Sequence, residues 1–468
     1  MRGSDAPLLL AGAAEFRAYP ARWWMVGALS LVALMQGGVW NTWSPIAPAM
    51  AQLFGWGDGT LALLANWGPI SYCLAVFPNS WAMDERGLRP AVLAAAGLVF
   101  GGCLARCFRT DAGSATTLIH AGQFLNGLAG PVAMSAAPVL SAAWFPAHER
   151  RTATALVESM NMLGVAISFV AGPYLVPPVA QADLPPGSPG SKAVPSAAQL
   201  AVLGRQTLLY MRGSAAVAAL ALAMVVVYFP SRPPSPPAPS AGVERVDFRA
   251  GVQRLLRHRQ FWVITLAYGV CTGVYGGWNG FIAPNLEAAL GHDRAESEAG
   301  WLGFWSSLAG VVAMPALGFA ADRTGWSLRR MLLVIMACAG IMVLWFALLC
   351  LDTVALPLRT WSLYTSCILG GALVFGSIPL FFEASVECTY PIAEGVTTGI
   401  MTLVLSTTCA FSFLYLLPTN SLLVAALASL LVIIGRRSTT SRASSSCSCR
   451  WSSPASSGAT GPWWPPAA

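Results

Sequence analysis

Charged side chains are scarce in this sequence, and that scarcity excludes most classes of protein. Of 468 residues, 10% are Asp, Glu, Lys or Arg, whereas a soluble domain carries about 25%. Hydrophobic residues make up 56% of the chain, and its mean hydropathy is +0.61. A water-soluble fold of this composition would have too little polar surface to expose. We therefore expect the chain to be inserted in a lipid bilayer.

Sequence signals for catalysis and metal binding are also missing. There is no nucleophile elbow, no P-loop and no His-rich metal spacing, and the 11 cysteines include no C-x-x-C pair. We therefore expect no metal and no cofactor, and a membrane-embedded enzyme is the least supported function. The net charge of +7 comes from basic residues scattered over separate loops, so nucleic acid is not an expected partner.

Long apolar segments are abundant, and each can cross a bilayer core, which takes roughly 20 residues. They predict an all-α membrane protein with twelve transmembrane helices, six in each half of the chain. The expected helices are 23–48, 61–83, 90–108, 116–143, 152–178 and 207–229, then 261–284, 299–321, 330–350, 359–382, 395–417 and 420–435.

Two short segments about half the chain apart resemble each other. An apolar segment containing Trp67 ends in Asp84, and one containing Trp305 ends in Asp322. Arginine and glycine follow each aspartate. A repeat of this length predicts two homologous six-helix bundles, the parallel repeat found in secondary transporters.

The basic residues orient the chain. Most arginines in short loops fall on the side that holds both termini, and such an excess marks the cytosolic side. The expected organisation is a cytosolic N-terminal tail (1–22), an N-terminal bundle (23–229), a cytosolic linker (230–258), a C-terminal bundle (259–435) and a Ser-rich low-complexity tail (436–468). The proline density at the start of the linker predicts an extended, non-helical spacer.

The repeated turns are expected to form a cytosolic gate; the alternative is a generic charged turn. A carboxylate and arginines in a tight turn can pair across helices, and glycine permits the sharp reversal between them. A second repeated pair, at Glu149 and Glu394, precedes two helices, where a glutamate favours the helix N-terminus. The expected gate residues are Asp84, Arg86, Gly87, Arg89, Glu149, Arg150, Asp322, Arg323, Gly325, Glu383 and Glu394.

The N-terminal tail carries a candidate sorting signal. Asp5 precedes the pair Leu9 and Leu10, the acidic dileucine pattern that sorting adaptors read for endosomes and lysosomes. Chance matches to so short a motif are the alternative. The first apolar segment is too long for a cleavable signal peptide. We expect a multi-pass lysosomal membrane protein with both termini in the cytosol and sorting adaptors among its partners.

The turns at Asp84 and Asp322 resemble the cytoplasmic signature of the major facilitator superfamily. Longer runs, at 39–46, 122–131 and 389–391, resemble a small solute carrier family that contains the feline leukaemia virus subgroup C receptors. This resemblance is colinear over about residues 16–435. Within that family it implies a lysosomal facilitator that exports pyridoxine (vitamin B6) to the cytosol, driven by protons.

The receptor branch of that family resembles a set of choline transporters, so departures from it matter. Its first-helix tryptophan corresponds to Trp40 here, but its glutamines in the fifth and eleventh helices correspond to Met162 and Ser406. The loss of two polar groups argues against choline, which stays the alternative substrate together with other organic cations. A regulatory membrane scaffold that has lost transport is a further hypothesis.

Aromatic and amide side chains are expected to line a central cavity, because at 1.5 Å per residue several lie in the lumenal half of their helices. Aromatic rings can stack on a pyridine ring or hold a cation, and amides can bond its hydroxyls. The alternative is an interfacial aromatic belt. The expected substrate-binding residues are Trp40, Asn41, Trp43, Trp67, Gln123, Asn126, Tyr275, Trp278, Asn279 and Trp305.

Proton coupling needs a titratable group at membrane depth. His120, near the lumenal end of the expected fourth helix, has a side chain that titrates in the range of an acidic compartment. Glu158 lies inside the expected fifth helix, where carboxylates are rare. Both are candidate proton sites, and a structural histidine at a helix end is the alternative for His120.

Overall fold

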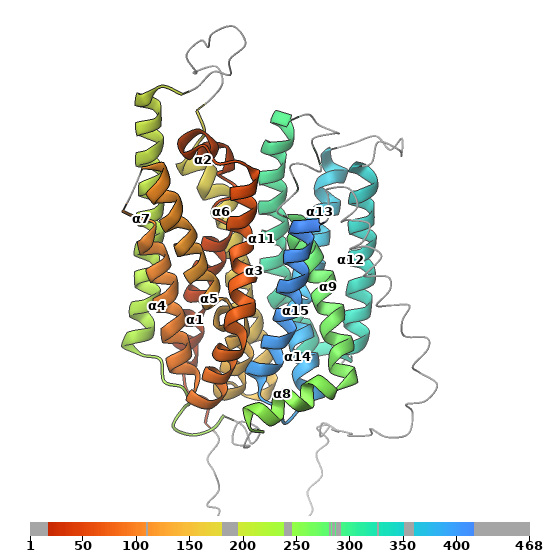
Figure 1. Cartoon of the computed structure of the whole chain (residues 1–468). Helices are drawn as coiled ribbons and strands as arrows, with labels where there is room; N and C mark the ends of the chain where they lie inside the picture. Colours follow the sequence, from red (N-terminus) through yellow and green to blue (C-terminus); the bar gives the residue numbers. More distant parts are fainter. Residues whose placement is uncertain are drawn as a thin grey trace, which may run out of the picture.

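The computed structural model is all-helical over the residues it describes, which are 17–108, 111–179, 195–237, 246–279, 292–324, 327–350 and 360–415, with Ile282 and Leu286. Nine helices within these ranges are long and apolar enough to cross a membrane. Figure 1 shows two bundles side by side, one coloured red to yellow-green and the other green to blue. The expected helix 420–435, the sorting signal at Asp5, Leu9 and Leu10, and Gly325 lie outside the described residues.

The N-terminal bundle runs from α1 to α7. Its helices are α1 (Ala21–Trp40), α2 (Ala47–Phe54), α3 (Asp58–Trp81), α4 (Leu88–Ala105), α5 (Ala112–Trp144), α6 (Arg150–Leu175) and α7 (Ala197–Val227), with a π-helical turn at Ala82–Arg86. Side chains cap two of them: Asp111 accepts from the Ser114 N–H before α5, and Ser196 forms a capping box with Gln199 before α7. These caps satisfy backbone donors that a helix start leaves free.

The first apolar segment differs from the single helix expected at 23–48. α1 ends at Trp40, and α2 begins at Ala47 after an irregular turn. Pro45 explains the break, because the residue before a proline is disfavoured in the helical conformation. Pro48 lies in the first turn of α2, where a missing N–H costs nothing.

The C-terminal bundle runs from α9 to α15, and α8 precedes it. The bounds are α8 (Phe248–Arg257), α9 (Arg259–Asn279), α11 (His292–Thr324), α12 (Leu328–Cys350), α13 (Thr360–Gly376), α14 (Ile378–Thr389) and α15 (Glu394–Tyr415). The segment expected as one helix at 359–382 is broken at Ser377 and continues as α14, whose second residue is Pro379. Glu383 and Glu387 consequently lie inside α14 rather than in a loop.

The linker is also more structured than its prolines predict. Its proline run is non-helical where described, but residues 248–257 form α8, which lies across one end of the molecule beneath α15 (Figure 1). Buried Gly251 faces Ile392 at the start of the C-terminal bundle's last described helix, while the Phe248 N–H donates to Glu85 Oε1 over 3.3 Å. Apolar and basic residues alternate with helical spacing here, which outweighs the neighbouring prolines.

Glycine brings the same helices together in both bundles. Gly164 of α6 has no room for a Cβ, because Leu34 O of α1 occupies that place. In the other bundle, a Cβ on Gly273 of α9 would lie 2.7 Å from Leu405 O of α15. The first and fifth expected helices of each half therefore pack backbone to backbone, which is what the sequence repeat predicts.

Candidate functional site

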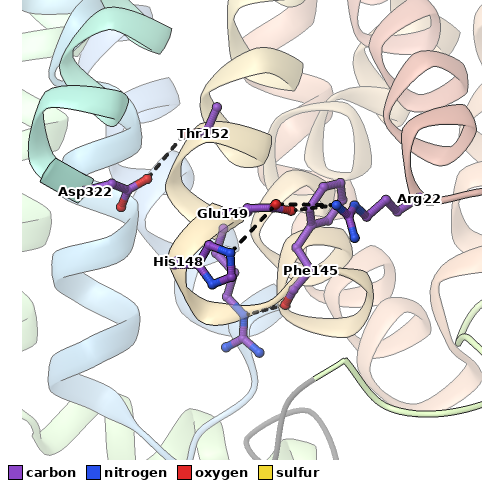
Figure 2. Close-up of polar contacts among 7 residues, drawn as sticks. Arg22, Phe145, His148, Glu149, Thr152 and Asp322 are labelled. Carbon is purple, nitrogen blue, oxygen red and sulfur yellow. Dashed lines mark hydrogen bonds and ion pairs between the residues drawn. The ribbon is translucent and has the colours of Figure 1, made fainter. Parts of the chain in front are cut away.

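The two bundles meet through α6 against α11 and α3 against α15. Asp322 lies in the last turn of α11, and Arg151 is the second residue of α6. Arg151 Nη1 donates to Asp322 Oδ1 over 3.1 Å, and its Nη2 donates to Glu387 Oε1 over 2.9 Å. Thr152 Oγ1 donates to Asp322 Oδ2 over 3.2 Å (Figure 2). One arginine of the N-terminal bundle thus holds two carboxylates of the C-terminal bundle.

The other repeated aspartate makes the equivalent contact differently. Asp84, at the end of α3, accepts from the backbone N–H groups of Gly395 and Val396 in the first turn of α15. A Cβ on Gly395 would lie 2.5 Å from Asp84 Oδ1, so the approach needs glycine. Ser80 Oγ adds a donated bond of 3.2 Å to Gly395 O. The positive end of the α15 helix dipole faces Asp84, but burial and the neighbouring Glu394 oppose a negative charge there, and Asp84 Oδ2 has no hydrogen-bond partner among the described residues.

These two contacts are related by the internal repeat. In each, the aspartate that ends the second helix of one half meets the first turn of the fifth helix of the other half. Arg151 and Thr152 meet Asp322, whereas backbone N–H groups at Gly395 and Val396 meet Asp84. One of the two contacts is therefore an ion pair with an added hydroxyl bond, and in the other an aspartate accepts from backbone N–H groups at a helix start.

Two expected gate residues, Glu149 and Arg150, form their ion pair and hydrogen bond within the N-terminal bundle, although Arg150 also interacts electrostatically with Glu383 of α14. Arg22 pairs with Glu149 at 3.0 Å, joining α1 to the turn before α6, and His148 Nε2 lies 3.8 Å from the same carboxylate (Figure 2). Arg150 Nε donates to Phe145 O over 3.1 Å, which holds the α5–α6 turn. These contacts brace the N-terminal bundle.

The remaining expected gate residues lie around the turns themselves. Arg86 lies over the Trp81 ring at 5.1 Å, and Arg323 lies over the Phe319 ring at 4.4 Å. Gly87 has φ +93°, so the reversal after Asp84 requires glycine there. The backbone N–H of Arg89 donates to Ser231 Oγ, Glu383 interacts electrostatically with Arg151, and Glu394 is buried beside Asp84.

One stripe of α6 faces the C-terminal bundle along the whole length of the helix. Its members are Arg151, Ala155, Glu158, Met162 and Phe169, spaced three, four or seven residues apart. Ala155 and Met162 belong to the apolar core of the C-terminal bundle, and Phe169 occupies the place of a Cβ on Gly303 of α11. Glu158, in the middle of this stripe, therefore lies at the interface between the bundles.

Glu158 lies in the electrostatic neighbourhood of a tyrosine from each bundle. It is 5% exposed and interacts electrostatically with Tyr72 of α3 and Tyr268 of α9. The Tyr72 hydroxyl lies 3.4 Å from Ser135 Oγ of α5 and donates to Gly399 O of α15 over 3.4 Å. Thr402 of α15 lies beside both tyrosines. We call Tyr72, Ser135, Glu158, Tyr268 and Thr402 the central polar cluster.

The central polar cluster has spare hydrogen-bonding capacity. Among the described residues, Glu158 Oε1 and the Tyr268 hydroxyl are buried without a hydrogen-bond partner. Buried polar atoms of this kind are rare and costly unless a ligand, water or proton completes them. Of this cluster, only Glu158 was expected from the sequence. A lone tyrosine in an apolar helix gives no sign of facing another bundle.

A chain of buried amides extends from the cluster to Gln36, Asn126 and Asn161. Gly130 lies between Tyr72 and Gln36. Asn161 Nδ2 donates to Gln36 Oε1 over 3.0 Å, and Asn126 Nδ2 donates to Gln36 O over 3.1 Å. The Oδ1 of Asn126 is buried without a partner in the part of the chain that the structure describes. Gln36 and Asn161 were missed in the sequence, although an amide inside an apolar helix is a usable signal.

Among the expected aromatic residues of the N-terminal half, Trp40 is the last residue of α1, four residues after Gln36. Trp40 Nε1 donates to Ala65 O over 3.1 Å, and Gln123 Nε2 donates to Trp40 O over 3.0 Å. Trp67 Nε1 donates to Nδ1 of His120 over 2.8 Å, within the N-terminal bundle. That bond needs a neutral Nδ1, so His120 carries its proton on Nε2 while the bond exists.

Other expected site residues lie apart from these. Asn41 Nδ2 donates to Ser168 Oγ over 2.9 Å, and Trp43 packs against Trp56 with ring centroids 5.4 Å apart. In the C-terminal bundle, the Tyr275 hydroxyl lies 3.0 Å from Ser306 Oγ, and Trp278 packs on Phe346 of α12 with centroids 4.9 Å apart. The side chain of Asn279 lies outside the described residues.

Trp305 lies on the outer face of α11. It is 43% exposed and shares a helical stripe with the exposed residues Trp301, Val312 and Phe319. Gly303, which meets Phe169 of α6, is on the opposite side of the helix. This arrangement is typical of a surface that faces lipid. The structure therefore does not gather the expected aromatic residues around a single cavity.

Comparison with known proteins shows which family this chain belongs to. Residues 29–413 match the model of the Major Facilitator Superfamily. The solute carrier family 49 member 4 homolog of Xenopus tropicalis is 39% identical over 404 residues, which cover 86% of each chain. The choline/ethanolamine transporter flvcr2b of Danio rerio is 28% identical over 83% of this chain and 76% of its own.

Solved structures agree on the fold. The crystal structure of the major facilitator superfamily transporter FucP in the outward conformation superposes with a TM-score of 0.62, 15% identity and coverage of 88% of this chain and 97% of that chain. The proton:xylose symporter XylE bound to a sugar analogue gives 0.61 at 12% identity, over 88% and 94%. The chain is thus a multi-pass membrane transporter of the major facilitator superfamily and, within it, of solute carrier family 49.

Proposed function

We propose that this transporter exports pyridoxine, a small ring-bearing nutrient, from the lysosome to the cytosol by proton-coupled alternating access. The observation that carries the proposal is Glu158, a buried carboxyl group at the interface of the two bundles, which has an oxygen without a hydrogen-bond partner among the described residues and interacts electrostatically with a tyrosine of each bundle. Alternating access moves this interface, so a proton and a substrate bound here are exposed first to one side and then to the other.

The chemistry of the central polar cluster suits the proposed substrate. Pyridoxine carries a pyridine nitrogen, a phenolic hydroxyl and two hydroxymethyl groups, all of which need hydrogen-bond partners when buried. Glu158 Oε1, Tyr268 and the free Asn126 Oδ1 supply acceptors and a hydroxyl. A proton on Glu158 would remove a buried charge at membrane depth and turn an acceptor into a donor. An acidic lumen would therefore load proton and substrate together.

The structure also supports a cytosolic gate made by the two repeated turns. Arg151 with Asp322, and Asp84 with the start of α15, hold the cytosolic ends together. In our proposal these contacts must break before pyridoxine leaves to the cytosol. We infer that the described state is the one closed on that side.

Choline is the second candidate, because relatives are choline/ethanolamine transporters by name. At the position of the family's fifth-helix glutamine, Met162 packs into the apolar core of the C-terminal bundle. We expect Met162→Gln to lower the half-saturating choline concentration roughly tenfold, since a hydrogen bond to a bound ligand contributes about 0.5–1.5 kcal/mol. Met162→Leu is the matched control and should leave the half-saturating choline concentration high. Strong choline uptake by the unaltered chain would reverse the assignment of substrate.

The proposed lysosomal address rests on the dileucine sequence. Replacing both Leu9 and Leu10 with alanine should move most of the protein to the plasma membrane, as measured by surface biotinylation and imaging. Replacing Leu8 alone, outside the pair, is the control. If the double variant stays in lysosomes, the motif is accidental or another signal dominates.

The double variant with alanine at Leu9 and Leu10, once at the plasma membrane, allows pyridoxine transport to be tested. Cells that carry it should take up labelled pyridoxine faster when the medium is at about pH 5 than at neutral pH, because the medium then replaces the lysosomal lumen. Unlabelled pyridoxine should compete, and choline should compete weakly. Uptake that is absent or independent of pH would reject proton-coupled pyridoxine transport and leave the choline or the scaffold hypothesis.

A further inference from the structure

Arg106 is a buried cation without a counter-charge. It ends α4 at the lumenal side of the N-terminal bundle and is 3% exposed. Its Nη2 donates to Cys103 Sγ over 3.3 Å, while Nε and Nη1 are buried without a hydrogen-bond partner among the described residues. A buried charge that lacks a partner costs several kcal/mol, so an arginine kept in this state needs an explanation.

The surroundings of Arg106 hold the Trp43 indole, the Cys103 and Cys107 thiols and the Tyr210 hydroxyl, which are all uncharged groups. The guanidinium lies 5.8 Å from the ring centre of Trp43, which is 2% exposed and whose Nε1 also has no partner among the described residues. Gly122 of α5 lies so close that a Cβ there would be 2.9 Å from Arg106 Cγ, which fixes the arginine stem. Two N–H groups and one indole N–H are therefore held in place with nothing to accept from them.

The local field is positive. Arg106 and Arg212 of α7 both act on the thiol of Cys107, just beyond the end of α4. No described carboxylate forms an ion pair with Arg106. The buried Arg106 guanidinium and an indole donor, with the exposed Arg212 nearby on α7, select for a ligand that is negative and accepts hydrogen bonds.

We propose that Arg106 and Trp43 bind a small monovalent anion of the chloride class at the lumenal end of the N-terminal bundle. One guanidinium nitrogen is already engaged by Cys103, and no described carboxylate pairs with the other two, so the site offers single donors rather than the paired fork that a carboxylate or phosphate uses. The site is separate from the central polar cluster. The anion enters this site from the lumen, and the site is not on the transport path.

The bound anion would brace the lumenal end of α1. Trp43 lies three residues after Trp40, and Gln123, which donates to Trp40 O, directly follows Gly122 on α5. A ligand that neutralises Arg106 therefore stabilises the turn that positions Trp40. The expected consequence is a more stable protein in chloride, independent of any transported substrate.

The test is thermal unfolding of the purified full chain in nanodiscs of neutral lipid, with chloride compared with gluconate at equal ionic strength and pH. Chloride, and bromide in its place, should raise the unfolding midpoint in a saturable way. Arg106→Gln should abolish this dependence, and Arg205→Gln, which removes an exposed arginine of α7, should keep it. An unaltered chain that melts identically in both anions would overturn the proposal.

Two further arms keep the result decisive. Trp43→Phe retains the ring and removes the N–H, so it should raise the chloride concentration for half-maximal stabilisation roughly three- to tenfold. This variant serves even if Arg106→Gln does not fold. A midpoint that rises with anionic lipid but not with chloride would mean that a phosphate headgroup occupies the site, which contradicts the chloride assignment. Chloride dependence unaffected by both substitutions would place the anion elsewhere.

Discussion

Glu158→Gln is expected to lower proton-driven pyridoxine uptake by roughly ten- to hundredfold, the equivalent of one hydrogen bond to a charged group at about 1.5–3 kcal/mol. Glutamine has nearly the same shape but cannot exchange a proton, so the pH dependence should vanish as well. Exchange of labelled for unlabelled pyridoxine at equal pH should persist, because that reaction needs no net proton movement. Uptake assays with the surface-exposed variant measure both quantities.

Two control substitutions separate coupling from general damage. Glu298 also meets a tyrosine, accepting a bond of 2.5 Å from Tyr364, but this pair lies within the C-terminal bundle. Glu298→Gln should therefore retain the pH dependence. His120→Ala should retain it too, since His120 pairs with Trp67 inside the N-terminal bundle. If His120→Ala flattens the pH profile while Glu158→Gln does not, the proton site is His120.

Asp322→Asn is expected to slow net transport roughly five- to thirtyfold by weakening the state that is closed to the cytosol. The Arg151 contact is partly exposed, 26% for the arginine and 11% for the aspartate, so we expect it to contribute about 1–2 kcal/mol rather than the value of a fully buried pair. Maximal uptake rate, corrected for surface expression, is the measurement. Asp322→Glu should recover part of the rate.

A double-variant cycle assigns that effect to the pair. Arg151→Gln combined with Asp322→Asn should be little worse than the stronger single variant, because both remove the same interaction. Arg22→Gln breaks an ion pair of similar length that stays within the N-terminal bundle, and it should leave the rate close to normal. Fully additive effects of Arg151 and Asp322 would show that they do not act as one gate.

Hydropathy and internal repeats predict the fold of this chain correctly. The two-bundle fold follows from apolar length and from the paired turns at Asp84 and Asp322, and the family comparisons confirm it. Local errors came from prolines: Pro45 ends α1 early, and Pro379 marks the second part of a broken helix. The prolines of the linker predict an extended segment, so α8 was not expected, although its amphipathic spacing begins after the prolines end.

The candidate site was harder to predict, because sequence position fixes the depth of a residue in the membrane but not the face of the helix. Trp40 and Trp305 have matching depths, yet Trp40 bonds to Ala65 O inside its bundle and Trp305 faces outwards. Arg151 follows Arg150 directly, and only the helix turn decides which of them reaches Asp322. Tyr72 and Tyr268 meet Glu158 only through the packing of both bundles.

Proton movement on addition of pyridoxine tests the central claim most directly. Proteoliposomes that contain the purified chain and a trapped pH-sensitive dye should show a saturable proton flux when pyridoxine is added to the acidic side, with no imposed voltage. Glu158→Gln should abolish the flux, and Glu298→Gln should preserve it. Pyridoxine transport without any proton flux, or proton flux that choline triggers and pyridoxine does not, would contradict the account.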